Sequence, residues 1–121
     1  MEYDNNIPIY LQIIDSIKTD IATGKINPGD KLPSTRQLAI VYGVNPNTAS
    51  RVYREMENDS MVYTKRGMGT YVIDSKEIID TLKQELAEQL LEQFTDGMVK
   101  LGFTKKEIVD CLVSKYEKEV E

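Results

Sequence analysis

Residues 34–54 read STRQLAIVYGVNPNTASRVYR, and this stretch decides the fold. Ser34 followed three positions later by Gln37 is a capping-box pattern, which predicts the start of a short helix. Gly43 predicts its end, because glycine readily adopts the left-handed conformation that often follows a helix. The dipeptide Asn45-Pro46 then predicts the cap and the first residue of the next helix. Two helices joined by a tight turn that contains glycine predict a helix-turn-helix.

The helix that follows Asn45 has two faces. Its apolar residues recur at helical spacing and are expected to face the core: Ala49, Val52, Tyr53 and Met56. By subtraction, the polar residues are expected to face solvent: Asn47, Ser50, Arg51 and Arg54. In the preceding helix the expected inward residues are Leu38, Ala39 and Tyr42. The second helix therefore offers a polar, cationic side that its own core does not use.

The flanking segments complete one unit. Upstream, an apolar stripe predicts a core helix through Tyr10, Ile13, Ile14, Ile17 and Ile21. Pro8 suits the first turn of that helix, and Gly24 suits its end. Downstream, residues 61–64 and 70–73 are rich in β-formers and predict two short strands. The cationic, glycine-containing segment 65–69 between them predicts a flexible hairpin tip, which is typical of a wing.

The character of the chain changes at Ser75. Apolar residues recur there every three or four positions, which predicts a long amphipathic helix that Gly102 interrupts. Thr104 and Glu107 form a second capping box before a last helix. Cys111, beside the apolar stripe of that helix, is expected to be buried or half-buried.

These two helices carry more apolar surface than they can hide from each other. The alternatives are an intrachain hairpin core and an interface between subunits, and the sequence favours the interface. Its expected residues are Ile79, Leu82, Leu86, Leu90, Phe94, Leu112 and Tyr116. The fold class is therefore mostly α with a small β-hairpin wing. A winged helix-turn-helix over residues 1–74 is followed by a two-helix dimerisation tail over residues 75–121.

The charge of the chain is distributed unevenly. The net charge is -5, which by itself disfavours a nucleic-acid partner. Residues 31–73, however, carry six basic and three acidic residues and include all four arginines. Residues 1–30 and 74–121 have net charges of -3 and -5. A basic island with acidic flanks favours binding of phosphate and base edges through the island alone.

The composition excludes several other classes. The chain has no histidine and one cysteine, so an ordinary zinc site, a disulfide and the usual neutral base of catalysis are not expected. No phosphate loop or nucleophile motif is present, and we expect neither an enzyme nor a cofactor. No apolar run is long enough for a signal peptide or a membrane span, so no membrane partner is expected. These features predict a cytoplasmic protein.

Several stretches together resemble the GntR family of bacterial regulators. Residues 8–13, PIYLQI, are similar to its opening helix in the YtrA-like branch. Residues 24–39, GKINPGDKLPSTRQLA, are close to its hallmark stretch, and residues 43–48 and 67–72 resemble its recognition-helix entry and wing. The match covers roughly residues 7–73. Ser60 departs from the family's usual glycine, which leaves a different turn open over residues 57–61.

The resemblance implies a homodimeric, sequence-specific DNA-binding transcriptional regulator, usually a repressor, on a two-fold operator. The short tail resembles that of the YtrA-like branch, whose members pair through it and often control transporter operons. Such a tail can hardly enclose a ligand pocket of about 300 Å³. Any small-molecule effector is therefore expected between subunits or between domains. The alternative is a winged-helix protein-interaction module without DNA binding, against which the outward cations of the basic island weigh.

Candidate DNA contacts follow from this resemblance and from helix position. They are Arg36, Asn45, Asn47, Thr48, Ser50, Arg51, Arg54, Lys65, Arg66 and Gly67. The resemblance implies that Arg36 contacts DNA, at a phosphate or at a guanine edge. Arg51 suits a guanine edge and Asn47 an adenine edge, because they lie where a recognition helix meets the bases. The alternatives without DNA contact are that Asn45 only caps its helix, that Arg54 pairs with a neighbouring glutamate, and that the remaining cations are solvated.

Overall fold

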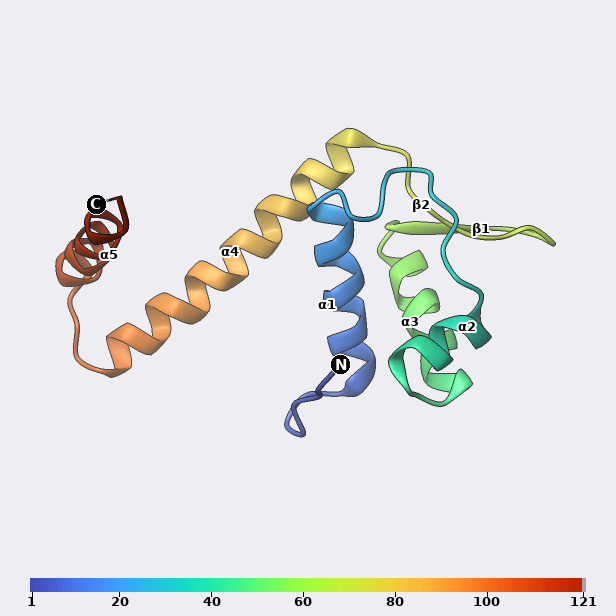
Figure 1. The fold of residues 1–121 in the computed structure, drawn as a ribbon, viewed down its shortest axis with the longest axis horizontal. Coiled ribbons are helices and arrows are strands. Elements are labelled where there is room, and N and C mark those ends of the chain that lie inside the picture. The colour runs from blue at the N-terminus through green and yellow to red at the C-terminus, as the bar shows by residue number, and fades with distance from the viewer. Residues whose placement is uncertain (121) are drawn as a thin grey trace. The chain divides into compact units, whose positions relative to one another are not determined.

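The computed structural model describes the backbone of residues 1–120 and the side chains of residues 1–118. The elements are α1 Ile9–Ala22, α2 Thr35–Tyr42, α3 Pro46–Asn58, β1 Val62–Lys65, β2 Gly69–Val72, α4 Lys76–Lys100 and α5 Lys105–Val120 (Figure 1). They form two compact units, Met1–Lys83 and Gln84–Glu121, and α4 runs from one into the other. The chain is mostly helical with one small hairpin, as the sequence predicts. No helix in the described part of the chain has the length and apolar character that a membrane crossing needs.

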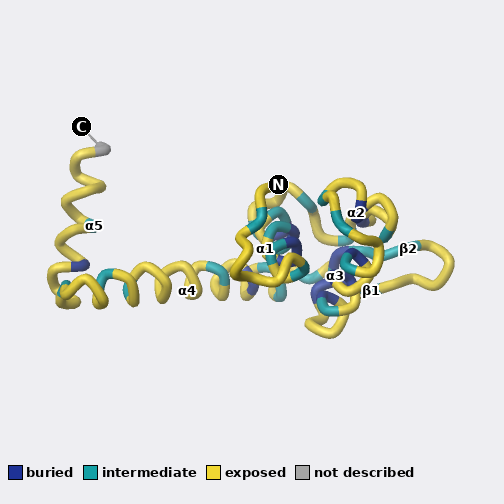
Figure 2. The backbone as a smooth tube through the Cα atoms, turned by 90° about the horizontal axis from the view of Figure 1, so that it is seen from below, coloured by how far each residue is buried: buried dark blue, intermediate teal, exposed yellow. Residues whose placement is uncertain are grey.

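The core of the first unit lies between α1, α2 and α3, where Figure 2 shows the buried segments of these helices. α3 packs against both other helices and against β1. The expected inward residues of α1 and α3 are buried: Ile13, Ile14, Ile17, Ile21, Ala49, Val52, Tyr53 and Met56. Tyr10 at the edge of this set is half-buried, as is Tyr42 of α2. The core fixes which side of α3 remains outside.

The ends of α2 and α3 follow the local chemistry. The backbone N–H of Gln37 donates to Ser34 Oγ at 3.2 Å, and the Ser34 N–H donates to Gln37 Oε1 at 2.9 Å, so the capping box is complete. Gly43 ends α2 with a left-handed φ of 66°. Asn45 Oδ1 accepts the Asn47 N–H at 2.8 Å, and proline occupies the first turn of α3. These caps close the tight turn that joins the two helices.

Strands β1 and β2 form an antiparallel hairpin that extends away from the helices (Figures 1 and 2). Its register pairs Val62 with Val72 and Lys65 with Gly69. Each strand therefore lies one residue closer to the tip than the sequence predicts. The reason is a tight turn, closed by the Met68 N–H donating to the Lys65 carbonyl at 2.9 Å. The segment before α2 braces the hairpin, because the Leu32 N–H donates to the Thr70 carbonyl at 2.8 Å.

The turn after α3 contains Ser60, where the resemblance to the family leads one to expect a glycine. Ser60 has a φ of 60°, which lies in the left-handed region that favours glycine. The Met61 N–H donates to the Met56 carbonyl at 3.0 Å and closes the turn. The serine thus adopts a glycine-like conformation, and the turn keeps a course that a glycine would also follow.

The second unit contains the end of α4, a turn and α5. The Thr104 capping box is present, with the Glu107 N–H donating to Thr104 Oγ1 at 3.2 Å and the Thr104 N–H donating to Glu107 Oε1 at 3.0 Å. The hydrogen bond from the Thr104 backbone N–H, with a smaller contribution from the Thr104 side chain, lowers the pKa of the Glu107 carboxyl. Ile108 is buried, whereas most other apolar side chains of the unit are exposed. Cys111 is exposed as well, so the prediction of burial is wrong: in the single chain most of α5 is uncovered, and of its side chains up to residue 118 only that of Ile108 is buried.

Candidate nucleic-acid interface

The start of α3 presents the polar side that the sequence predicts. Because the apolar positions of the helix are used in the core, its other side points to solvent. Exposed residues there are Asn45, Asn47, Ser50, Arg51 and Arg54, and Thr48 is half-buried. The Asn45 side-chain oxygen is occupied by the cap, whereas the side chains of Asn47 and Ser50 form no hydrogen bond within residues 1–118.

Arg51 has a partner that sequence reasoning missed. The Cζ atom of its guanidinium lies 3.8 Å from the ring centroid of Tyr10, which comes from the first turn of α1. This is a cation–π stack between residues 41 positions apart, so no local pattern could have revealed it. Arg51 remains exposed despite the stack.

Arg54 is not paired with a neighbouring glutamate. Among the side chains of residues 1–118, Lys18 and Asp59 form the one ion pair, at 3.7 Å, and Arg54 takes no part in it. Glu57, one of the two expected alternatives, accepts the Thr64 hydroxyl at 2.9 Å. The Arg54 guanidinium therefore extends from α3 with its donors available to a partner.

Arg36 and the start of α3 border one surface depression. Arg36 lies in the first turn of α2 and is exposed. It lines a hollow of about 360 Å³ together with Ala39, Ile40, Gly43, Val44 and Pro46. The tight turn brings the two helices around this hollow. Arg36 thus borders the same depression as Pro46 at the start of α3.

The wing carries the other predicted cations. Lys65, Arg66 and Gly67 are exposed. Tyr63 and Tyr71 stack with ring centroids 5.8 Å apart, and Lys65 Nζ lies 4.8 Å from the Tyr71 centroid. The stacked rings support the lysine on one side of the hairpin and leave its ammonium in solvent.

Lys31 is a further cation at the wing. It belongs to the basic island, but it was not among the candidate DNA contacts predicted from the sequence. It forms a β-bridge with Tyr71. Its Cε lies 2.8 Å from where a Cβ of Gly69 would be, so the absence of a side chain at Gly69 leaves room for the lysine. Lys31 and Gly69 are distant in sequence and meet only because the segment before α2 lies against the hairpin. Short-range sequence patterns do not reveal such a contact.

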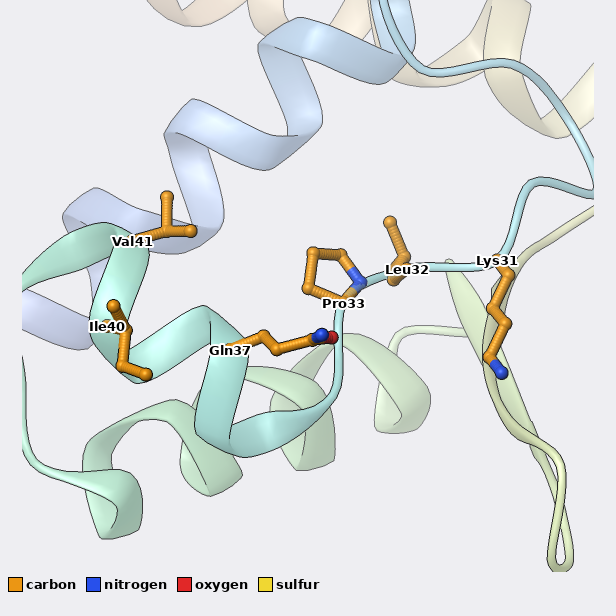
Figure 3. Close-up of a pocket in the computed structure, with 6 residues that line it drawn as sticks. All are labelled: Lys31, Leu32, Pro33, Gln37, Ile40 and Val41. Carbon is orange, nitrogen blue, oxygen red and sulfur yellow. The ribbon is translucent and has the colours of Figure 1, made fainter.

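A second hollow, of about 680 Å³, lies between α2 and the segment that precedes it (Figure 3). It is lined by Lys31, Leu32, Pro33, Gln37, Ile40 and Val41. Ile40 is 80% exposed, so the hollow is open to solvent and is not an enclosed ligand cavity. The Tyr53 hydroxyl donates to the Pro33 carbonyl at 2.5 Å and fixes the chain at its edge. Burial, with a smaller contribution from Tyr42, raises the pKa of that hydroxyl.

The residues predicted for subunit pairing divide between the two units. Leu82 is 4% exposed and already covered within the first unit. Ile79, Leu86 and Leu112 are half-buried, whereas Leu90, Phe94 and Tyr116 are exposed. Further exposed apolar residues of the tail, absent from the predicted set, are Leu91, Val99, Leu101, Val109 and Val113.

Comparison with known proteins agrees with this architecture. The model of the gntR family of bacterial regulatory proteins matches residues 9–72, from α1 to the end of the wing. The chain belongs to the GntR family. It is a transcriptional regulator with a DNA-binding helix-turn-helix, not an enzyme. The family resemblance found in the sequence is confirmed.

Relatives match beyond the DNA-binding unit. The HTH-type regulator YhcF of Bacillus subtilis is 45% identical over 109 residues, 90% of each chain. The HTH-type transcriptional repressor YtrA of the same organism is 38% identical over 95 residues, 77% of this chain and 73% of that protein. The match to YtrA confirms the resemblance to its branch.

Solved structures carry the same fold. A GntR-family regulator from Listeria monocytogenes matches with a TM-score of 0.85 and 42% identity, over 93% of this chain and 98% of that one. The DNA-binding domain of AraR in complex with the operator ORX1 matches with a TM-score of 0.52 and 30% identity, over 55% of this chain and 80% of that one. A structural neighbour of the first unit is therefore known on DNA.

Proposed function

We propose that this chain is a cytoplasmic, homodimeric repressor that binds a two-fold operator, with a transporter operon as a candidate target. The start of α3 enters the major groove, Arg36 contacts the adjacent backbone, and the wing reaches a neighbouring groove. The tail residues 75–121 join the two subunits. The observation that carries the proposal is that all six basic residues of the basic island, residues 31–73, are exposed and form no ion pair within residues 1–118, on a chain whose net charge is negative.

The α3 surface supports base recognition in particular. Arg51 and Asn47 are exposed on the first two turns of the helix, the part of a recognition helix that meets base edges. A guanidinium suits the paired acceptors of guanine, and an amide suits adenine. Arg36 lies on α2, outside this helix, and together with the lysines at the wing it is assigned to phosphates. Specificity is thereby assigned to α3 and most of the affinity to its surroundings.

The exposed apolar side chains of α4 and α5 support pairing of subunits. Leu90 is 67% exposed and Tyr116 is 62% exposed in the single chain. Clustered apolar exposure of this kind marks an interaction surface. A closed two-fold dimer would cover it and would place two DNA-binding units on half-sites about 10 bp apart or a multiple of that. Repression is favoured because the similar YtrA protein is named a repressor.

Selection of bound duplexes from a random pool tests the proposal directly. We expect an enriched motif with two-fold symmetry. The variant Arg51→Ala should bind that motif with about 1–3 kcal/mol less free energy and should relax the preference at one base pair in each half-site. The matched control is Lys25→Ala, an exposed cation outside the basic island. Failure to enrich any motif would favour the protein-interaction alternative.

A further inference from the structure

We propose that Tyr10 is a positioning residue for DNA recognition, which holds the Arg51 guanidinium in place for a base edge; this inference rests on the proposed function. The two residues come from different helices, α1 and α3. The guanidinium carbon lies 3.8 Å from the centroid of the tyrosine ring, which is stacking contact. Tyr10 thereby acts on DNA through Arg51.

The stack constrains Arg51 without using its hydrogen-bond donors. The guanidinium lies over the ring with its Cζ 3.8 Å from the centroid, and this contact with the π electrons uses the charge of the group, not an N–H donor. An ion pair would instead occupy those donors. Within residues 1–118, Arg51 forms no ion pair and no side-chain hydrogen bond, and it remains exposed. The donors needed for a two-point contact with guanine are therefore free.

Tyr10 is well placed for this task because its own position is fixed. It lies at the edge of the α1 stripe whose next members, Ile13 and Ile14, are buried, and it is itself half-buried. A free arginine loses considerable rotamer freedom when it binds, whereas one already stacked loses less. The stack should therefore favour binding of the base that Arg51 reads and sharpen the preference for it.

The ring, not the hydroxyl, is the part that matters in this arrangement. The Tyr10 hydroxyl forms no hydrogen bond within residues 1–118. Tyr10→Phe should therefore keep operator affinity close to that of the parent protein. Tyr10→Leu should weaken binding roughly two- to fivefold, the magnitude of an exposed cation–π contact. Tyr10→Met, with an unbranched side chain, serves as a second ring deletion if the leucine variant folds poorly.

A double-mutant cycle with Arg51→Ala distinguishes positioning from general packing. The probe is a duplex carrying the motif recovered in the selection, and thermal unfolding of every variant is measured alongside. We expect Tyr10→Leu to have no further effect in the Arg51→Ala background. Equal losses in both backgrounds would overturn the inference, as would a loss on Tyr10→Phe. Ring-current shifts of the Arg51 side-chain NMR signals in the free protein, lost in Tyr10→Leu, are expected as DNA-independent support.

The inference and the proposed function can fail separately. If no duplex is bound selectively, the proposed function is wrong and the inference falls with it. If Arg51→Ala weakens specific binding but Tyr10→Leu does not, only the role of Tyr10 is overturned.

Discussion

The backbone of Ser60 is strained in a way that the backbone of a glycine at this position would not be. Its φ of 60° lies in the left-handed region, which costs a residue with a Cβ about 1–2 kcal/mol. Glycine loses about 0.5–1 kcal/mol more conformational entropy on folding. Ser60→Gly should therefore raise the free energy of unfolding by about 0.5–1 kcal/mol. Urea unfolding followed by circular dichroism measures the difference.

The matched control is Ser114→Gly on the exposed surface of α5. Glycine in a helix interior is unfavourable, so this variant should be less stable by about 0.5 kcal/mol. Opposite signs for the two variants would locate the strain at Ser60. A Ser60→Gly protein that unfolds more easily than its parent would contradict the assignment.

The wing makes a prediction that depends on salt. Lys65 stands over the stacked tyrosines with its ammonium in solvent, which suits a phosphate and not a base edge. Lys65→Ala should weaken binding to specific and unrelated duplexes alike. The slope of log affinity against log salt should become shallower by about one. Titrations at several salt concentrations, with Lys25→Ala as control, check this; an unchanged slope would remove Lys65 from the interface.

Helix limits could be predicted because they depend on neighbours in sequence. The Ser34 and Thr104 capping boxes and the Asn45 cap are chemistry between residues two or three positions apart, and all three are present. The hairpin was placed within one residue, since its register depends on the geometry of a turn. Fold class and family followed from the order of these local features.

Contacts between distant segments could not be predicted in the same way. The stack of Tyr10 on Arg51 and the position of Lys31 against Gly69 both depend on how elements cross. Apolar periodicity placed Leu82 in the same stripe as Leu90, although one is buried and the other exposed. Periodicity identifies a helix face but does not say what covers it. The sequence therefore identified candidate cations but not the residues from other segments that pack against them.

The tail makes a prediction about assembly. A chain ending after Lys83 keeps Leu82 in the first unit and lacks the exposed apolar residues of the second. It should be monomeric in sedimentation and should bind the operator at least about a hundredfold more weakly, because the two half-sites are no longer linked. A truncated chain that still sediments as a dimer would exclude the tail as the interface.

A point variant tests the same surface in the full chain. Leu90→Glu replaces an exposed apolar side chain on α4, and Gln89→Glu adds the same charge at the exposed neighbouring position. The first should dissociate the dimer, and the second should not. Equal behaviour of the two variants would contradict a packing role for Leu90.

The exposed sulfur on α5 has a practical consequence. Cys111 is the only thiol in the chain and reaches solvent in the monomer. The parent sequence can therefore take up one maleimide dye or one nitroxide per polypeptide, with no background labelling to remove by mutagenesis. Electron-spin distances between two such tags would follow the assembled regulator before and after an operator is added.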